Sequence, residues 1–396
     1  MAWKLDAAEA GFRQEVRDFL DEALTPELRT AGRRCSGIFS DYDDGIRWHR
    51  ILAQRGWSVP SWPVEHGGTG WTPMQHYIFA SELAQADAPP LAPNSTRMVA
   101  PVIIAFGTEA QKQRWLPGIR NGDDYWAQGY SEPQAGSDLA SLQCRAVRDG
   151  EHYVINGTKI WTTHAHWSNR MFCLVRTASG GKAQQGISFL CFDLDLPGIT
   201  VRPIVSISGD HELNQVFFDD VRVPVSSLLG EENQGWAIAK YLLAHERGHA
   251  WAPLLRARLR RLREAARAAW PHSDADEARD MALRLAEADC AIDAVEALEL
   301  QALRAQVQGE PPGIRPSMGK VLGSELRQRL TELGIEIAGR YAAVNLPLAD
   351  SLQGELPVPE EAVFSMSAYL NDRAASIYAG SNEVQRNLIA AHLLRG

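Results

Sequence analysis

The first 120 residues alternate apolar and polar positions in the manner of helices. Near the N-terminus apolar residues recur at steps of three and four, which places them on one helix face. They are Phe12, Val16, Phe19, Leu20 and Leu24. Segments 74–85 and 101–120 are also helical in pattern, with Gly107 marking a break in the second. We therefore predict an N-terminal helical domain over residues 1–121.

The pattern changes near residue 122. Short runs of β-branched and aromatic residues follow, separated by Gly and Pro, at 171–176, 187–193, 199–203 and 216–223. Segment 153–161 has two such runs on either side of Asn156-Gly157, the strongest short hairpin signal, so we predict a hairpin there. Together these runs predict a middle antiparallel β-barrel or sandwich domain over residues 122–233.

After Gly235 the chain becomes helical again. Long helical stretches are expected at about 236–269, 276–308 and 317–340, with a last helix after Gly380. These stretches predict a C-terminal four-helix bundle over residues 234–396. The fold class is α+β, in the order helices, β-domain, helical bundle.

Composition narrows the functional classes. The 396 residues are 45% hydrophobic and 22% charged, as in soluble globular proteins. The net charge of −9 argues against nucleic acid as a partner. No apolar run approaches the roughly 20 residues of a membrane span, and no signal peptide is evident. Five scattered cysteines without CxxC spacing indicate reduced thiols. We expect a cytoplasmic protein.

One basic run stands out between residues 256 and 267. It consists of Arg256, Arg258, Arg260, Arg261, Arg263 and Arg267. Two interpretations are open: the solvated face of a helix, or a contact for a phosphate-bearing ligand or a partner subunit.

Two segments of the β-domain carry candidate chemistry. Segment 128–138 has the sequence QGYSEPQAGSD, a loop that can present backbone N–H groups and hydroxyls to an anionic or polar ligand. Segment 156–163 has the sequence NGTKIWTT, which ends a strand with an aromatic residue between hydroxyls, a suitable wall for a flat ring. Taken alone, each segment is also typical of an ordinary turn.

Together the two segments resemble the β-domain of acyl-CoA dehydrogenases. Three more stretches agree: FFDDVRVP at 217–224, GEENQGW at 230–236, and SIYAGSNEVQR at 376–386, which is similar to the family's IYEGxxEIQR signature. The resemblance implies an enzyme that binds FAD. Gln128, Tyr130 and Ser131 match positions at the flavin ring, and Ser137 matches a contact to the FAD pyrophosphate or the substrate. The other matched cofactor positions are Trp161, Thr163, Ser381 and Glu383.

The signature departs from the family at the catalytic base. The usual glutamate after the tyrosine of IYEG is Ala379 here, and alanine cannot accept a proton. The isovaleryl- and long-chain-type members place the base on the first helix after the β-domain, before an arginine. Glu246 and Arg247 stand there in this chain. We predict Glu246 as the base, against the alternative of an ion pair with Arg247 or a helix-surface cap.

Neighbouring positions take secondary roles in the same resemblance. It places Arg247 near the CoA, with a surface ion pair as its alternative, and gives the backbone N–H of Ala379 the task of polarising the thioester carbonyl. His245 and His249 are expected to be pocket or core histidines, and segment 210–212 (DHE) is expected to be structural. We expect no metal site.

A second departure concerns assembly. Homotetrameric members carry an RxxFG segment and a GGxG segment that reach the FAD of a neighbouring subunit. The corresponding stretches here are AWPHSDAD at 269–276 and ELGIEIAGR at 332–340. Neither stretch keeps the family's segment. In this the chain resembles the large (α) subunit of heteromeric pimeloyl-CoA and steroid side-chain acyl-CoA dehydrogenases. We therefore expect a paralogous small subunit as partner in an α2β2 heterotetramer, in place of a homo-oligomer.

The resemblance implies α,β-dehydrogenation of an acyl-CoA, with electrons passed to an electron-transfer flavoprotein. Steroid or bile-acid side chains and dicarboxylyl groups are candidate acyl portions, because Gly248 beside the base suits a wide pocket. Two alternatives stay open: a flavin monooxygenase or oxidase on the same fold, which would not need Glu246, and a non-catalytic subunit of a dehydrogenase complex.

Overall fold

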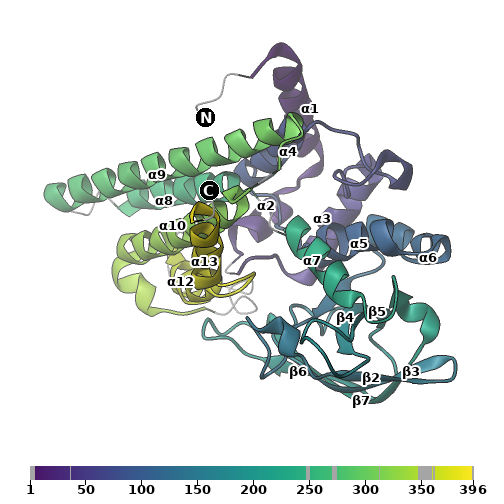
Figure 1. Cartoon of the computed structure of the whole chain (residues 1–396). Helices are drawn as coiled ribbons and strands as arrows, with labels where there is room; N and C mark the ends of the chain where they lie inside the picture. The colour runs from purple at the N-terminus through teal and green to yellow at the C-terminus, as the bar shows by residue number, and fades with distance from the viewer. Residues whose placement is uncertain are drawn as a thin grey trace.

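The computed structural model describes residues 5–35, 37–246, 250–269, 274–311, 313–346, 359 and 362–394, with only the backbone described at 244–246. Helices at both ends of the chain flank an eight-stranded sheet (Figure 1). The predicted α+β fold class, with helices, then strands, then helices, is confirmed.

The N-terminal helices begin at clear sequence signals. Thr72 and Thr108 each form a capping box with the glutamine three residues on, which satisfies backbone N–H groups at the helix start. The helices are α1 (Ala7–Ala23), α2 (Pro26–Arg33), α3 (Tyr42–Arg55), α4 (Pro73–Gln85), α5 (Ala100–Phe106) and α6 (Glu109–Asn121). A short π-helix, η2 (Asn94–Val99), leads into α5.

The sheet is mostly antiparallel. Its order is β6-β7-β3-β2-β4-β5-β8, and β1 pairs with β4 in a parallel sense. The strands are β1 (Trp126–Gly129), β2 (Arg145–Asp149), β3 (His152–Lys159), β4 (Arg170–Arg176), β5 (Ile187–Asp193), β6 (Ile199–Ile204), β7 (Leu213–Pro224) and β8 (Leu228–Leu229). β4 and β5 are almost wholly buried, which explains their continuous apolar sequences.

The hairpin predicted at Asn156-Gly157 is wrong. β3 runs through both residues and pairs with β2 on one side and with β7 on the other, with a shift of register at this point. Gly157 has φ 148, and a Cβ there would lie 2.8 Å from the Cα of Cys144. The glycine therefore marks a close approach of two strands at a β-bulge. The tight turn lies at Gly150, which has φ 58, between β2 and β3.

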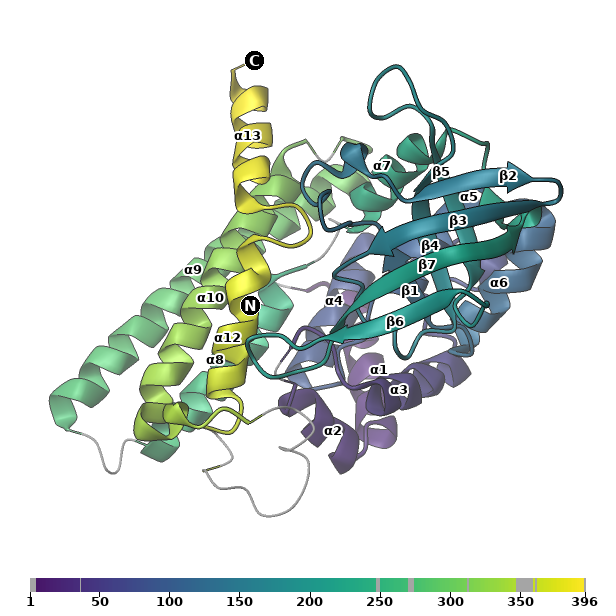
Figure 2. The ribbon, with the colours of Figure 1, turned by 90° about the horizontal axis from the view of Figure 1, so that it is seen from below.

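The C-terminal helices form a bundle in which α8, α9 and α10 lie side by side (Figure 1). They are α8 (Ala252–Ala269), α9 (Ala275–Val307), α10 (Arg315–Ala338), α12 (Ser365–Asp372) and α13 (Asn382–Leu393). α13 packs against α10 and projects away from the sheet (Figure 2). Within the described residues, no helix is long and apolar enough to cross a membrane.

The arginine run of α8 binds carboxylates of neighbouring elements. Arg256 donates to Asp289 of α9 at 3.2 Å, and Arg260 donates to Asp87, in the loop after α4, at 2.6 Å. The Arg256 side chain is only 19% exposed. The solvated-face interpretation is therefore wrong for these arginines, which tie α8 to the rest of the protein.

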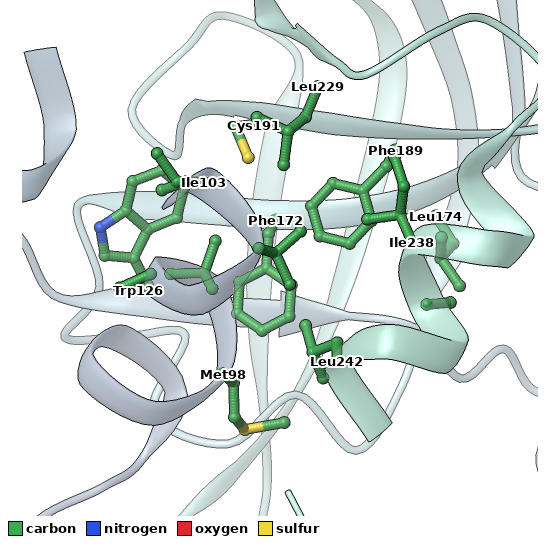
Figure 3. Packing of buried hydrophobic residues seen from close by; sticks show 14 of the residues in the cluster. Met98, Ile103, Trp126, Phe172, Leu174, Phe189, Cys191, Leu229, Ile238 and Leu242 are labelled. Carbon is green, nitrogen blue, oxygen red and sulfur yellow. The ribbon is translucent and has the colours of Figure 1, made fainter. Parts of the chain in front are cut away.

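One hydrophobic core joins the sheet, the N-terminal helices and α7 (Gly235–Glu246), the first helix after the sheet. Trp126 and Phe172 come from β1 and β4, Ile103 comes from α5, and Leu242 comes from α7 (Figure 3). All four side chains are at most 1% exposed. The position of α7, whose last residue is Glu246, is thus fixed by packing against the sheet.

Asp372, at the end of α12, is 0% exposed and forms ion pairs with Arg327 of α10, at 2.5 Å, and with Arg258 of α8. Although burial opposes it, these guanidinium groups hold the pKa of Asp372 below its ordinary value. The stabilisation is thus present above that ordinary value and lost as the pH falls. We expect Asp372→Asn to lower the unfolding free energy by about 3–5 kcal/mol, since two half-buried cations lose their buried partner.

The matched control is Asp149→Asn, which breaks a pair with Arg222 whose side chains are 64% and 52% exposed. It should cost less than about 1 kcal/mol in urea unfolding at neutral pH. Equal losses for the two variants would contradict this account of the bundle.

Candidate active site

The flavin side of the candidate site begins at the end of β1. Gln128 is half-buried and Tyr130 is buried, and β1 pairs with β4 in a parallel sense. Gly129 permits this close packing, because a Cβ there would lie 2.9 Å from the Cys173 sulfur. The predicted residue Ser131 follows directly, half-buried at the start of the loop that leaves the strand.

A buried ion pair beneath this loop was not assigned a role from the sequence. The Lys159 ammonium lies 2.7 Å from the Glu132 carboxylate, and their side chains are 0% and 2% exposed. Lys159 also donates to the backbone oxygen of Tyr130 at 3.1 Å, and Glu132 accepts from the backbone N–H groups of Gln143 and Cys144. One pair therefore fixes both ends of the loop. The sequence signal for this pair was weak, because β3 carries other polar residues besides Lys159, such as His152 and Asn156.

The second segment lies directly beside the first. The backbone N–H of Ile160 donates to the backbone oxygen of Ser131 at 2.9 Å, so Trp161 and Thr163 come next to the β1 loop. Trp161 has φ 59 and leaves 57% of its surface exposed, although it is a large aromatic residue. Such strain and exposure together are typical of a residue that contacts a ligand.

The C-terminal signature is held by α10. Lys320 is 5% exposed and donates to the backbone oxygen of Ala375 at 2.7 Å and to the Asn382 side chain at 3.1 Å. These two hydrogen bonds hold both ends of the loop between Ala375 and Asn382. Ala379 lies in this loop with φ 54, a left-handed conformation that costs a non-glycine residue about 1 kcal/mol. Ser381 caps α13 by accepting from Val384, and the predicted residue Glu383, on the first turn of α13, is exposed.

The loop before β7 links the segments of the sheet that carry candidate cofactor residues to the C-terminal helices. The backbone N–H of His164 donates to the backbone oxygen of Glu212 at 2.9 Å, and Asn371 of α12 donates to the Glu212 carboxylate at 3.4 Å. Burial raises the pKa of Glu212 to about 6. Among the described residues, no hydrogen bond joins Thr163 directly to Ser381. Ser137 stays exposed on its loop.

Histidines beyond Thr163 form a polar network. His164 and Tyr125 share a hydrogen bond of 2.7 Å, and the rings of His166 and His211 stack 3.9 Å apart. Burial and the neighbouring histidines lower the pKa of His164 to about 3 and that of His166 to about 4, so both rings are neutral at pH 7. Segment 210–212 belongs to this network. No group of three potential metal ligands occurs in the described part of the chain.

Several residues that the sequence predicts for the site have no described side chain. Glu246 closes α7 as its last residue, but only its backbone is described, as is that of His245. Arg247 and His249 lie outside the described residues altogether. α7 itself packs against β5, α5 and η2.

The residues at hand fit a large polar ligand such as FAD. Several buried polar atoms of the described residues have no hydrogen-bond partner, and among them are three inside the stretches that resemble cofactor motifs. These three are Thr162 Oγ1, the Tyr378 hydroxyl and Gln385 Oε1. Buried polar groups are normally satisfied, so their orphaned state is consistent with a ligand or partner that completes them.

Three family models match consecutive parts of the chain. They are the acyl-CoA dehydrogenase N-terminal domain at residues 6–123, the middle domain at 127–221 and the C-terminal domain at 233–394. The chain belongs to the acyl-CoA dehydrogenase family. It is an oxidoreductase that acts on acyl-CoA, and members of the family are generally FAD-dependent.

Relatives agree over almost the full length. Acyl-CoA dehydrogenase IpdE1 of Mycobacterium tuberculosis is 36% identical over 97% of this chain and 96% of its own, and FadE26 of the same organism is 34% identical over 95% and 94%. Among solved structures, a Tcur3481-Tcur3483 steroid acyl-CoA dehydrogenase superposes with a TM-score of 0.85 at 28% identity over 100% and 99% of the two chains. The ChsE4-ChsE5 complex from Mycobacterium tuberculosis gives 0.82 at 31% identity over the same shares.

Lys159→Met tests the buried pair of the acyl-CoA dehydrogenase sheet. It leaves the Glu132 carboxylate buried without its cation, so we expect a loss of about 3–5 kcal/mol in unfolding free energy. Adding Glu132→Gln removes the stranded charge and should recover at least about 1 kcal/mol. As a control, Lys112→Met breaks an exposed pair with Glu109 and should cost less than about 1 kcal/mol. If the double variant loses as much unfolding free energy as Lys159→Met and Glu132→Gln lose together when each is measured alone, the two residues are not coupled.

Proposed function

We propose that the chain catalyses FAD-dependent α,β-dehydrogenation of an acyl-CoA thioester to the trans-2-enoyl-CoA, with Glu246 as the base. The observation that carries the proposal is which residues stand at the family's two alternative base positions. The family's usual base position holds Ala379, while Glu246 is the last residue of α7, a helix that packs against the sheet core. Without a base at one of these positions, the retained cofactor segments would have no use.

Residues of this chain have distinct roles in the proposed reaction. Glu246 removes the α-proton as the general base. The backbone N–H of Ala379 polarises the thioester carbonyl, held by the loop that Lys320 braces. Arg247 and Ser137 contact the substrate.

The cofactor would be held by residues of both candidate groups. They are Gln128, Tyr130, Ser131, Ser137, Trp161, Thr163, Ser381 and Glu383. When bound, FAD supplies the chemistry of accepting the β-hydrogen as a hydride. The exposed face of Trp161 supports a place against the flat ring, and the Ser131 hydroxyl would donate to the ring edge. The electrons then pass to an electron-transfer flavoprotein.

A partner subunit is part of the proposal. The chain lacks the family segments that complete FAD binding across subunits, and two of the similar structures, Tcur3481-Tcur3483 and the ChsE4-ChsE5 complex, are named for two proteins each. Apolar side chains are also exposed along and beside α13: Ile377, Val384, Leu388, Leu393 and Leu394. Such a surface suits burial against another protein. We propose a paralogous small subunit in an α2β2 assembly, acting on a bulky acyl group such as a steroid side chain.

Removal of the base tests the reaction. Glu246→Gln should lower kcat by about 10²–10⁴-fold, because general-base catalysis is lost while binding is kept. Adding Ala379→Glu supplies a carboxylate at the usual family position and should restore roughly tenfold of the loss. The control is Glu231→Gln, an exposed glutamate before α7 that should leave turnover within about twofold. Full activity of Glu246→Gln, measured with an artificial electron acceptor, would contradict the assignment.

Co-expression tests the partner. The chain expressed alone should be poor in flavin, and co-expression with an acyl-CoA dehydrogenase-like protein encoded beside it should give one FAD per pair. Leu388→Asp on α13 should weaken co-purification without a change in helical content, because it places a charge in the apolar contact. A homotetramer of the lone chain with one FAD per chain would rule out the partner.

A further inference from the structure

Asn214, the second residue of β7, is a buried polar residue that holds the candidate flavin segment. It is 0% exposed, and β7 lies between β6 and β3 (Figure 2). Its backbone oxygen accepts from the backbone N–H of Thr162 at 2.9 Å, and its side-chain amide donates to the backbone oxygen of Thr162 at 3.0 Å. Asn214 therefore fixes the peptide backbone between Trp161 and Thr163, two residues that the sequence predicts for the cofactor.

The conformation of Trp161 depends on such support. Its φ of 59 is left-handed, which a bulky residue adopts only where its surroundings impose it. On one side, the backbone N–H of Ile160 donates to the backbone oxygen of Ser131 at 2.9 Å. On the other side, Asn214 provides the two bonds to Thr162. With both neighbours fixed, the exposed ring of Trp161 keeps one position.

The amide of Asn214 also determines where two histidines carry their protons. Its Nδ2 faces the backbone oxygen of Thr162, which can only accept, so the orientation of the amide is settled. The same Nδ2 lies 3.0 Å from His166 Nδ1, and the amide oxygen lies 2.8 Å from His211 Nε2. Because the amide nitrogen donates and the oxygen accepts, His166 has a bare Nδ1 and His211 has its proton on Nε2.

A proton on His166 Nδ1 breaks this arrangement, because it brings an N–H group against the amide N–H group. Asn214 can then accept from His166 only by turning its oxygen round, and it loses its side-chain bonds to Thr162 and His211. Water reaches both rings, since His166 and His211 line an open pocket of about 320 Å³.

The neutral state of His166 has a defined pH range. Burial, and then the charge of His211, lower the pKa of His166 from 6.5 to about 4. The arrangement with neutral His166 is thus fully favoured above pH 6.5, and its stabilisation is lost as the pH falls towards 4. The other titratable groups around His166 are His211, His164, Tyr125, Glu212 and Asp195.

We propose that Asn214 is a positioning residue for the flavin-facing segment 161–163, and that this segment keeps its place only while His166 is neutral. The inference rests on the proposed function and goes beyond it, because it names a residue that controls FAD binding from behind the segment, through the backbone of Thr162. It also makes FAD binding sensitive to acid through one identified imidazole.

The test measures the Kd of FAD by flavin fluorescence, for the complex with its partner subunit, from about pH 7.5 to about pH 5. For the wild type, the Kd should rise about tenfold over this range. Asn214→Asp should raise the Kd about 10- to 100-fold already at pH 7.5, because the Thr162 backbone oxygen loses its donor. His166→Asn places an oxygen where Nδ1 was, so it still accepts from Asn214 but takes up no proton. It should bind FAD tightly and lose the acid dependence.

The matched control is His152→Gln, which removes a histidine of the same sheet at the start of β3 and should keep the acid dependence of the wild type. Circular dichroism shows whether each variant is folded, and if Asn214→Asp is not, His166→Asn decides alone. A wild type without acid dependence, a folded Asn214→Asp with an unchanged Kd, or an acid dependence that persists in His166→Asn overturns the inference, while the proposed function stands. If the wild-type complex binds no FAD, the proposed function fails and the inference fails with it.

Discussion

A charge buried inside a sheet must be neutralised where it lies, and here that constraint shapes the flavin side of the site. The Lys159 ammonium on β3 donates to the Glu132 carboxylate and to the Tyr130 backbone oxygen, both in or beside the loop after β1. Because Glu132 in turn holds the backbone of Gln143 and Cys144, the loop cannot move without breaking several charge-assisted bonds. Ser131 and Trp161, which we propose face the flavin, lie next to this pair and so stand on a rigid support.

Buried contacts also fix the other two parts of the proposed site, which are α7 and the C-terminal loop. Hydrophobic packing sets α7 against the sheet through Leu242, and buried ion pairs and the Lys320 ammonium set the C-terminal loop against α10. The three parts of the proposed site thus come from distant stretches of the chain, each fixed by buried contacts of a different kind. The left-handed Ala379 persists because that loop is held at both ends.

Much of the architecture was predictable from periodicity and turn chemistry. The helical steps near Phe12 and the apolar runs of β4 and β5 appear where expected. Gly157 was misassigned because a glycine that permits close strand approach and one that forms a turn look alike in sequence. The arginines of α8 were left with two interpretations, and neither foresaw their carboxylate partners, such as Asp87, which lie far away in the chain. Motif resemblance pointed to the candidate cofactor residues, whereas the buried pair of Lys159 became visible only once burial and neighbours were known.

The central claim is that Glu246 removes the α-proton. The most direct measurement is exchange of that proton: the flavin-loaded enzyme is held with an acyl-CoA in D2O without an electron acceptor, and deuterium at the α-carbon is followed by mass spectrometry. The account predicts incorporation by the wild type and none above background by Glu246→Gln. Continued exchange in Glu246→Gln, with its flavin content intact, would show that another group is the base.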